Sequence, residues 1–243
     1  MGIEHLSESW GDWRPTAASV LDWWHEAGVD VLVDDLPRDW LAAPVRVEVA
    51  PVPLVEAPTA LPATLAEFLA WRAGEAAPEA GWRGATITAS GPADAAVMIL
   101  SDCPDREDEA DCALFGGAAG RLLDRMLAAI GLIRDEVHVA AVCARRPLAG
   151  RMPGEVEARL GEIARHHVAL VAPRRLLLLG NAASRAVLGT ETARARGGLR
   201  PLNHAGGETG VVASFHPRLL IERPAQKAES WKDLQMLIAG MDR

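Results

Sequence analysis

The sequence predicts an α/β fold: a three-layer α/β/α sandwich with a central, mostly parallel four-stranded sheet and an N-terminal helical extension. The first observation behind this prediction is that short, continuously apolar runs alternate with longer helical stretches from about residue 95 onward. Continuously apolar strands are typical of a parallel sheet that helices cover on both faces. The second observation is the composition. Of the 243 residues, 49% are hydrophobic and 24% are charged, which suits a soluble globular protein with a sizeable core.

Four strand–helix units account for the regular part of the chain. The strands are expected at residues 96–100, 137–142, 176–179 and 211–215. The helices that follow them are expected at about 119–130, 153–171, 181–188 and 225–239. Pro153 suits the first turn of the second helix, and Asn181 is the expected N-cap of the third. Ahead of these units, Thr64 and Glu67 have the spacing of a capping box that opens a further helix through Trp71.

The beginning of the chain has a different character. Residues 1–42 are expected to form a Trp-rich helical extension, since they hold Trp10, Trp13, Trp23, Trp24 and Trp40. Apolar residues at helical spacing predict an amphipathic helix over residues 16–27 that ends at Gly28. Residues 43–62, rich in Pro, Ala and Val, are expected to be a linker, and residues 63–243 the main domain. The extension is either an extra packing layer or a binding site for a protein partner.

Several protein classes are excluded by the sequence. No apolar run approaches the ~20 residues that span a bilayer, and the N-terminus has no basic start followed by an apolar stretch. We therefore expect a cytoplasmic protein with no membrane partner. The three cysteines, Cys103, Cys112 and Cys143, show no C-x-x-C spacing. They predict neither a disulfide framework nor a four-thiolate metal site, so we expect no metal and no cofactor.

The distribution of charge bears on whether nucleic acid is a partner. The net charge of −8 counts against it, but residues 121–200 hold 14 Lys and Arg against 7 Asp and Glu. Residues 1–120 hold 6 against 21. Every basic residue of the middle block is arginine, the side chain best suited to paired bonds with phosphate. The block is therefore either a solvated face or a phosphate-facing surface.

The ends of the expected strands select candidate functional residues. In a parallel sheet the ligand crevice lies outside the carboxyl ends of the strands. The residues found there are Ser101, Asp102, Cys103 and Asp105 after the first strand, Ala141 in the second, Gly180 and Asn181 after the third, and His216 after the fourth. A carboxylate and a histidine at neighbouring strand ends can perform acid–base or electrostatic chemistry.

Two segments resemble a known family. The first is LFGGAAG, residues 114–120, which continues as RLLDRMLAAIGL. The second is SFHPRLL, residues 214–220, with Pro224, Lys227, Trp231 and Asp233 downstream. In this order and spacing they resemble the bacterial family-four uracil-DNA glycosylases, the iron–sulfur type. The resemblance covers about residues 94–238 and implies a glycosylase fold, a DNA partner and excision of uracil in base excision repair.

The resemblance also implies roles for individual residues. His216 would donate a hydrogen bond to the uracil oxygen as it becomes anionic, and Asp102 would stabilise the sugar cation or orient water. Phe115 would stack on the flipped base. The substrate pocket would be completed by Ser101, Cys103, Asp105, Ala141, Gly180 and Asn181. DNA contacts would come from Arg145, Arg146, Arg151, Pro217, Arg218 and Leu219.

Some residues depart from the family pattern. The family motif G-E-x-P-G reads S-D-C-P-D at residues 101–105, and the family's uracil-reading Asn is replaced by Ala141. The four cluster cysteines are also missing, and Arg145 and Leu160 stand at two of their positions. The resemblance therefore implies no iron–sulfur cluster in this protein.

Three functions remain open at this point. The first is a monofunctional uracil-DNA glycosylase, which the presence of His216, Asp102 and Phe115 favours. The second is a catalytically degenerate module that binds DNA or protein, which the loss of the Asn and the presence of Asp105 favour. The third is excision of another damaged base. Structural roles are the alternative for each residue: His216 in a turn, Asp102 as a cap and Phe115 in the core.

Overall fold

A computed structural model describes residues 13–28, 60–147 and 152–241 of the chain. The chain divides into two compact units, Met1–Ala57 and Pro58–Arg243. In the first unit, helix α1, Trp13–Glu26, contains most of the predicted amphipathic helix, and Gly28 follows it with φ +78°. Its large apolar side chains Leu21 and Trp23 are 68% and 63% exposed. The predicted linker, 43–62, lies mostly outside the described residues.

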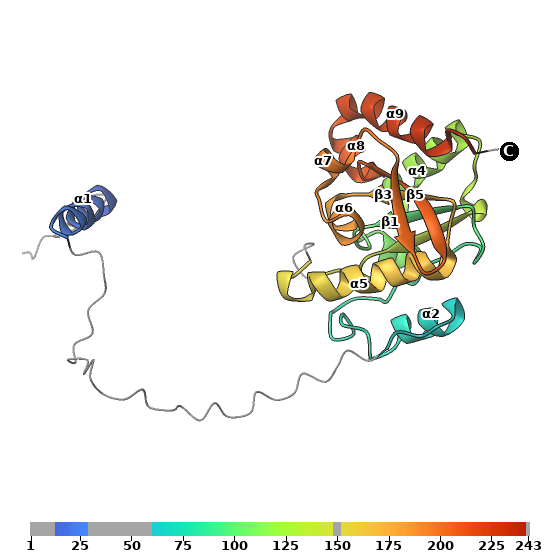
Figure 1. Ribbon diagram of the computed structural model, residues 1–243, viewed down its shortest axis with the longest axis horizontal. Helices are drawn as coiled ribbons and strands as arrows, with labels where there is room; N and C mark the ends of the chain where they lie inside the picture. The colour runs from blue at the N-terminus through green and yellow to red at the C-terminus, as the bar shows by residue number, and fades with distance from the viewer. Residues whose placement is uncertain (1–12, 29–59, 148–151, 242–243) are drawn as a thin grey trace, which may run out of the picture. The chain divides into compact units, whose positions relative to one another are not determined.

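The second unit is built on a five-stranded sheet in the order β2-β1-β3-β5-β4 (Figure 1). Its strands are β1 Val97–Ser101, β2 Val137–Ala141, β3 Arg175–Leu179, β4 Arg200–His204 and β5 Gly207–Ser214. β2, β1, β3 and β5 are mutually parallel, and β4 pairs with β5 in the antiparallel direction. The predicted α/β fold with a mostly parallel sheet is confirmed.

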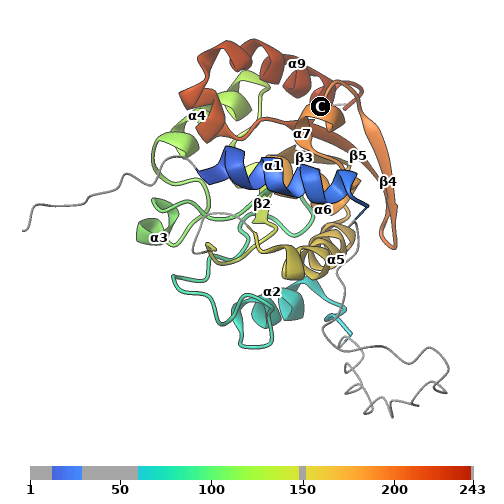
Figure 2. The same ribbon diagram turned by 90° about the vertical axis from the view of Figure 1, so that its left-hand side faces the viewer.

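The predicted number of four strands is one too few. The missing strand is β4, which forms the outer edge of the sheet beside β5 (Figure 2). Its sequence, R-P-L-N-H, is exposed or half-buried along its length, so it lacks the apolar run by which the other strands were found. A proline is tolerated in such an edge strand because its backbone nitrogen can face away from the ladder. Pairing with β4 also extends β5 back to Gly207.

Helices cover both faces of the sheet, which gives the predicted three layers (Figure 1). Against one face pack α2 Leu65–Ala73, α5 Gly154–Val171 and α6 Asn181–Leu188. Against the other pack α4 Gly117–Ala129, α8 Pro217–Glu222 and α9 Lys227–Ile238. Leu176 and Leu178 of β3 face the first group, whereas Leu177 and Leu179 face the second. The apolar run of β3 is therefore explained by burial on both sides.

Short helices complete the unit: α3 Asp108–Asp111, η1 Arg134–Glu136, α7 Thr192–Ala195 and η2 Pro224–Gln226. Thr64 caps α2 as predicted, because its Oγ1 accepts the Glu67 backbone N–H at 3.3 Å. The Glu67 carboxylate in turn accepts the Thr64 hydroxyl at 2.8 Å. No helix of the described part of the chain is both long and apolar enough to cross a membrane.

A buried histidine pair joins the sheet to α5. His138 of β2 and His167 of α5 are 1% and 5% exposed, and their Nε2 atoms lie 3.0 Å apart. The Nδ1 atom of His138 lies 3.0 Å from the Pro92 carbonyl oxygen. Because a carbonyl only accepts, His138 donates from Nδ1, and His167 donates from Nε2 to His138. Burial lowers the pKa of both rings, so the pair is neutral at pH 7.

Candidate active site

The carboxyl ends of the four parallel strands meet at one edge of the sheet. Ser101 pairs in register with Ala141 on one side and with Leu179 on the other, and Leu179 pairs with Ser214. Asp102, Gly180 and His216 follow these strand ends directly or within two residues. A cavity of about 750 Å³ opens there, lined among others by Asp102, Arg146, Gly180, Asn181, Phe215, His216, Arg218 and Leu219. A second cavity of about 450 Å³ shares Asp102 and Asn181 and adds Cys103, Cys143 and Arg185.

Asp102 caps the helix that follows a neighbouring strand. Its Oδ1 accepts the backbone N–H of Ala183 at 2.7 Å, at the N-terminus of α6. Burial raises the pKa of Asp102 to about 6, against the backbone hydrogen bonds, which lower it. The carboxylate is thus held in place by a helix N-terminus, where negative charge is favoured, and it borders both cavities.

Gly180 is required by this arrangement. Its φ is +111° and its ψ 175°, a conformation almost restricted to glycine. A Cβ at this position would lie 2.4 Å from Oδ2 of Asp102. The structure also corrects the predicted cap of α6. The N-cap residue is Gly180 and its missing side-chain acceptor is supplied by Asp102, whereas Asn181 accepts the Thr192 N–H at 3.1 Å.

His216 is fixed as a hydrogen-bond donor. It is the N-cap of α8, and its Nδ1 accepts the backbone N–H of Arg218 at 3.2 Å. The proton of the neutral ring is therefore on Nε2. Burial, with a smaller contribution from the charge of Arg218, lowers the pKa of His216 to about 4. At neutral pH His216 offers an uncharged N–H to a cavity that Asp102 also lines.

Phe115 lies against His216 rather than along the walls of the two cavities. Its ring is buried and stacks on the imidazole, with centroids 5.3 Å apart and planes 20° apart. Its φ is +59°, unusual for a bulky residue. Arg134 stabilises this strained loop by donating to the carbonyl oxygens of Leu114, Phe115 and Gly120 at 3.1–3.2 Å. In this geometry Phe115 stacks on the histidine, and its stacking on a flipped base stays a prediction.

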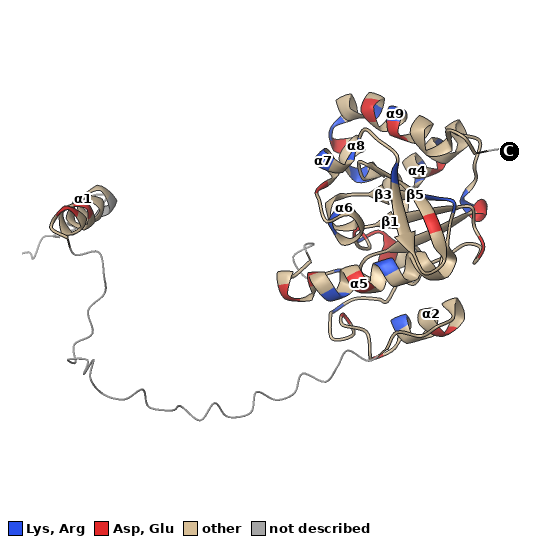
Figure 3. Ribbon diagram, viewed as in Figure 1, with Lys and Arg blue, Asp and Glu red and all other residues tan. Residues whose placement is uncertain are grey.

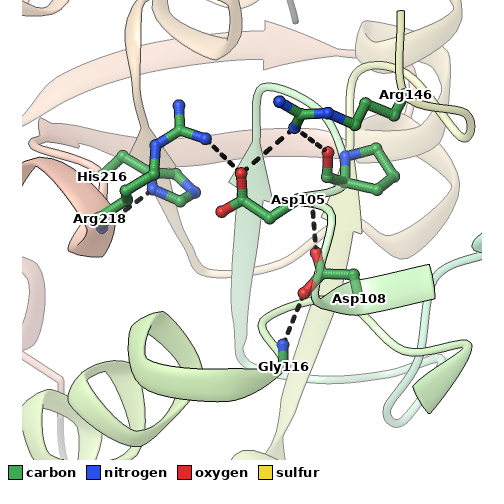
Figure 4. Close-up of polar contacts among 7 residues, drawn as sticks. Asp105, Asp108, Gly116, Arg146, His216 and Arg218 are labelled. Atoms are coloured by element: carbon green, nitrogen blue, oxygen red, sulfur yellow. Dashed lines mark hydrogen bonds and ion pairs between the residues drawn. The ribbon is translucent and has the colours of Figure 1, made fainter. Parts of the chain in front are cut away.

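Asp105 connects the loops around the larger cavity (Figure 4). Its carboxylate pairs with Arg146 at 3.3 Å and with Arg218. Its backbone N–H donates to Asp108 at 2.8 Å, and Asp108 also accepts the N–H of Gly116 at 2.6 Å. The loop after β1 is thereby bonded to the loop that carries Phe115 and to α8, which follows His216.

The remaining predicted residues are placed as follows. Ser101 is buried at the end of β1, and Ala141 is half-buried at the end of β2. Pro217 is buried in the first turn of α8, and Leu219 lines the larger cavity. Burial raises the pKa of Cys103 to about 11, so its thiol stays protonated at neutral pH. Arg151 lies outside the described residues.

Arg145, which we expected to contact DNA, makes hydrogen bonds within the chain. Its guanidinium donates to Thr86 Oγ1 at 2.7 Å and to the carbonyl oxygens of Ala80 and Trp82 at 2.6 and 3.0 Å. These bonds use the side chain to hold the segment between α2 and β1. In the same region Arg72 and Glu79 form a buried ion pair at 2.8 Å, and Glu79 accepts the N–H of Ala144.

Many arginines of the arginine-rich block bond to acceptors of the same chain. Basic and acidic residues both occur along α5 and along α9 (Figure 3). Internal carboxylate or carbonyl partners are present for Arg134, Arg165, Arg175, Arg185, Arg196 and Arg200. Of the two alternatives for this block, neither a purely solvated face nor a continuous phosphate-facing surface describes it.

An iron–sulfur cluster does not fit the residues present. Such clusters are held by four cysteine thiolates, and the chain has three cysteines. Arg145 is bonded as described above, and Leu160, a residue of α5, is fully buried in the core. Throughout the described ranges, no group of three or more His, Cys, Asp or Glu side chains is arranged to hold a metal ion.

Sequence comparisons relate the chain to a known family. Residues 88–235 match the family described as the uracil DNA glycosylase superfamily. A Type-4 uracil-DNA glycosylase of Pyrobaculum aerophilum is 29% identical over 171 residues, which cover 67% of this chain and 87% of the relative. Type-4 uracil-DNA glycosylases of Archaeoglobus fulgidus and Thermotoga maritima are 28% and 27% identical, covering 59% and 56% of this chain and 75% and 71% of the relatives.

The residues that brace the site were missed by sequence reasoning. Arg134, and Asp108 in its bond to Gly116, act through bonds to backbone groups 8 to 20 positions away. No periodicity or motif links such positions. The glycine pair Gly116-Gly117 is a local sequence signal of a turn after Phe115, whose φ is positive in the structure.

Proposed function

The chain belongs to the uracil-DNA glycosylase superfamily, and from this premise we propose that it hydrolyses the N-glycosidic bond of uracil, or of a related damaged base, in DNA. The observation that carries the proposal is the pairing of a neutral Nε2–H donor on His216 with the carboxylate of Asp102 around one cavity. Cleaving the bond between base and sugar places negative charge on the base and positive charge on the sugar. A donor and a carboxylate are the two groups that this charge separation requires.

His216 supports the leaving base. Its Nε2–H is directed by the bond from the Arg218 N–H to Nδ1, so the donor needs no reorganisation when the base oxygen becomes anionic. Because the pKa of His216 is about 4, the ring stays neutral and donates a hydrogen bond without transferring its proton. Phe115 keeps the imidazole plane in place by stacking on it.

Asp102 supports the sugar. Its carboxylate stabilises the developing cation or orients the attacking water, and the N-terminus of α6 prevents it from collapsing onto the cation. Because the pKa of Asp102 is about 6, the group is ionised at neutral pH and loses its charge in mildly acidic solution. Both roles need the charged form, since a protonated carboxyl neither stabilises a cation nor accepts a proton.

A second candidate function is a DNA-binding module without catalysis. The observation that favours it is Ala141, whose methyl group at the end of β2 offers no hydrogen bond to a base. Excision assays on single-stranded and duplex oligonucleotides with uracil, hypoxanthine or xanthine separate the candidates. Release of any of these bases by the purified chain supports the glycosylase, and binding without release supports the module.

The proposed activity defines the proposed partners. DNA is the macromolecular partner, and a role in the repair of DNA agrees with a location in the cytoplasm. Because α1 has exposed apolar residues, we propose the N-terminal extension as a binding site for a protein partner.

A further inference from the structure

Two arginines of the larger cavity converge on a single carboxylate. Arg146, from the segment after β2, and Arg218, from the first turn of α8, both bond to Oδ1 of Asp105 (Figure 4). The Asp105 side chain is 18% exposed, whereas that of Arg218 is 55% exposed. Both arginines line the cavity that contains His216 and Asp102. Two basic groups of this cavity are therefore neutralised in part by an acidic group of the same chain.

The position of Asp105 is fixed from several sides. Its backbone N–H donates to Asp108, which is 4% exposed. Arg146 also donates to the carbonyl oxygen of Pro104 at 2.9 Å. The Asp105 carboxylate is therefore a held group between two guanidinium groups, not a side chain that samples the solvent. Two guanidinium groups around one anionic group form a site that accepts the oxygens of a phosphate equally well.

We propose that Arg146 and Arg218 form a binding site for a DNA backbone phosphate, and that Asp105 occupies this site as an internal competitor. The proposal rests on the proposed function only in taking DNA as the ligand. A phosphate that enters must displace the carboxylate and remain near its negative charge, which weakens binding. Asp105 thus lowers the affinity for any DNA sequence and leaves recognition of the base to the cavity.

The test is the affinity for undamaged duplex DNA, measured by fluorescence anisotropy over a series of salt concentrations. Asp105→Asn keeps the size of the side chain and removes its charge. We expect it to bind about tenfold more tightly than wild type, with the slope of log K against log salt steeper by about 0.9, the value for one additional phosphate neutralised. Asp94→Asn is the matched control. Asp94 is exposed and precedes β1, at the end of the strand opposite the site, so it changes the net charge equally.

A double variant tests whether the arginines cause the increase in affinity. If the carboxylate competes for them, adding Arg218→Ala to Asp105→Asn abolishes most of the increase in affinity. If the increase persists, it arises from general charge and the proposal is wrong. Asp105→Ser serves as a second removal of the charge in case the Asn variant fails to fold, which thermal unfolding of each variant reveals.

A purely structural role of Asp105 predicts a different result. If Asp105 serves only to clamp the loops together, its replacement lowers the melting temperature and leaves DNA binding equal or weaker, with an unchanged salt slope. That outcome overturns the proposal. Because the DNA is undamaged, the result does not depend on excision: a chain that releases no base can still show the tighter binding, and an active glycosylase can fail to show it. A chain that binds no DNA in either form also overturns the proposal.

Discussion

Replacing Gly180 tests the link between the backbone after β3 and the Asp102 carboxylate. Gly180→Ala forces an L-residue into a conformation with φ +111° and ψ 175°, at a cost of about 1–3 kcal/mol. The new Cβ also lies 2.4–2.7 Å from three atoms of the Asp102 carboxyl group. The carboxylate must move, and the loss of its cap on α6 costs about 1 kcal/mol more. The free energy of unfolding should therefore fall by about 2–4 kcal/mol.

Gly189→Ala is the control for backbone strain alone. Gly189 follows α6 with φ +67°, and a Cβ there meets nothing within 4 Å. An L-residue in this left-handed conformation costs about 1–2 kcal/mol. Urea denaturation followed by circular dichroism measures both variants, and single-turnover excision measures the displacement of Asp102. We expect Gly180→Ala to lose more stability and at least about tenfold more activity than Gly189→Ala. Equal losses in the two variants would refute the role assigned to Gly180.

Three further predictions follow from the site and its surroundings. The excision rate should rise with pH through about 6, where Asp102 ionises, and Asp102→Asn should slow excision and remove this inflection. An unchanged pH profile in the variant would exclude the Asp102 carboxylate as the group that titrates. The free energy of unfolding should fall as pH drops below 6.5, because burial lowers the pKa of His138 and His167 in the folded state and the unfolded chain then binds more protons. Urea denaturation at pH 7.5 and 5 should show a smaller fall when both histidines are replaced by Gln, and an equal fall would mean that other groups cause it. Arg146→Ala should weaken DNA binding and flatten its salt dependence, whereas Arg145→Ala should lower the melting temperature and leave the salt dependence of binding unchanged. The reverse pattern would identify Arg145 as the DNA contact.

The parallel core of the fold was predictable because burial on both faces leaves a direct trace in the sequence. β3 is apolar at four consecutive positions after Arg175, and such runs identified all four parallel strands. β4 has no apolar run of this kind, because it pairs with β5 on one side and is exposed to solvent on the other. Its pairing depends on the hairpin at Gly207, where φ is +123°. An exposed edge strand is therefore defined by its neighbour rather than by its own residues.

The membership of the candidate site was predictable to the extent that strand ends define it. The rule that ligands bind at the carboxyl ends of parallel strands selected Asp102 and His216, which line one cavity. The direction of each side chain was not predictable. Asp102 caps α6 across the sheet, and Phe115 stacks on His216. Arg145 turns toward the loop before β1. Each of these contacts joins residues far apart in the sequence, so no spacing rule reveals it.

The measurement that tests the account most directly is single-turnover release of a damaged base by wild type and by His216→Ala. We expect wild type to release uracil or a related base, and His216→Ala to be slower by about 10² to 10³, the effect of removing one preorganised donor. DNA affinity should change little, because this hydrogen bond strengthens only as the base becomes anionic. If wild type and His216→Ala bind DNA equally and are equally inert on uracil, hypoxanthine and xanthine, the glycosylase proposal is wrong and the binding module takes its place.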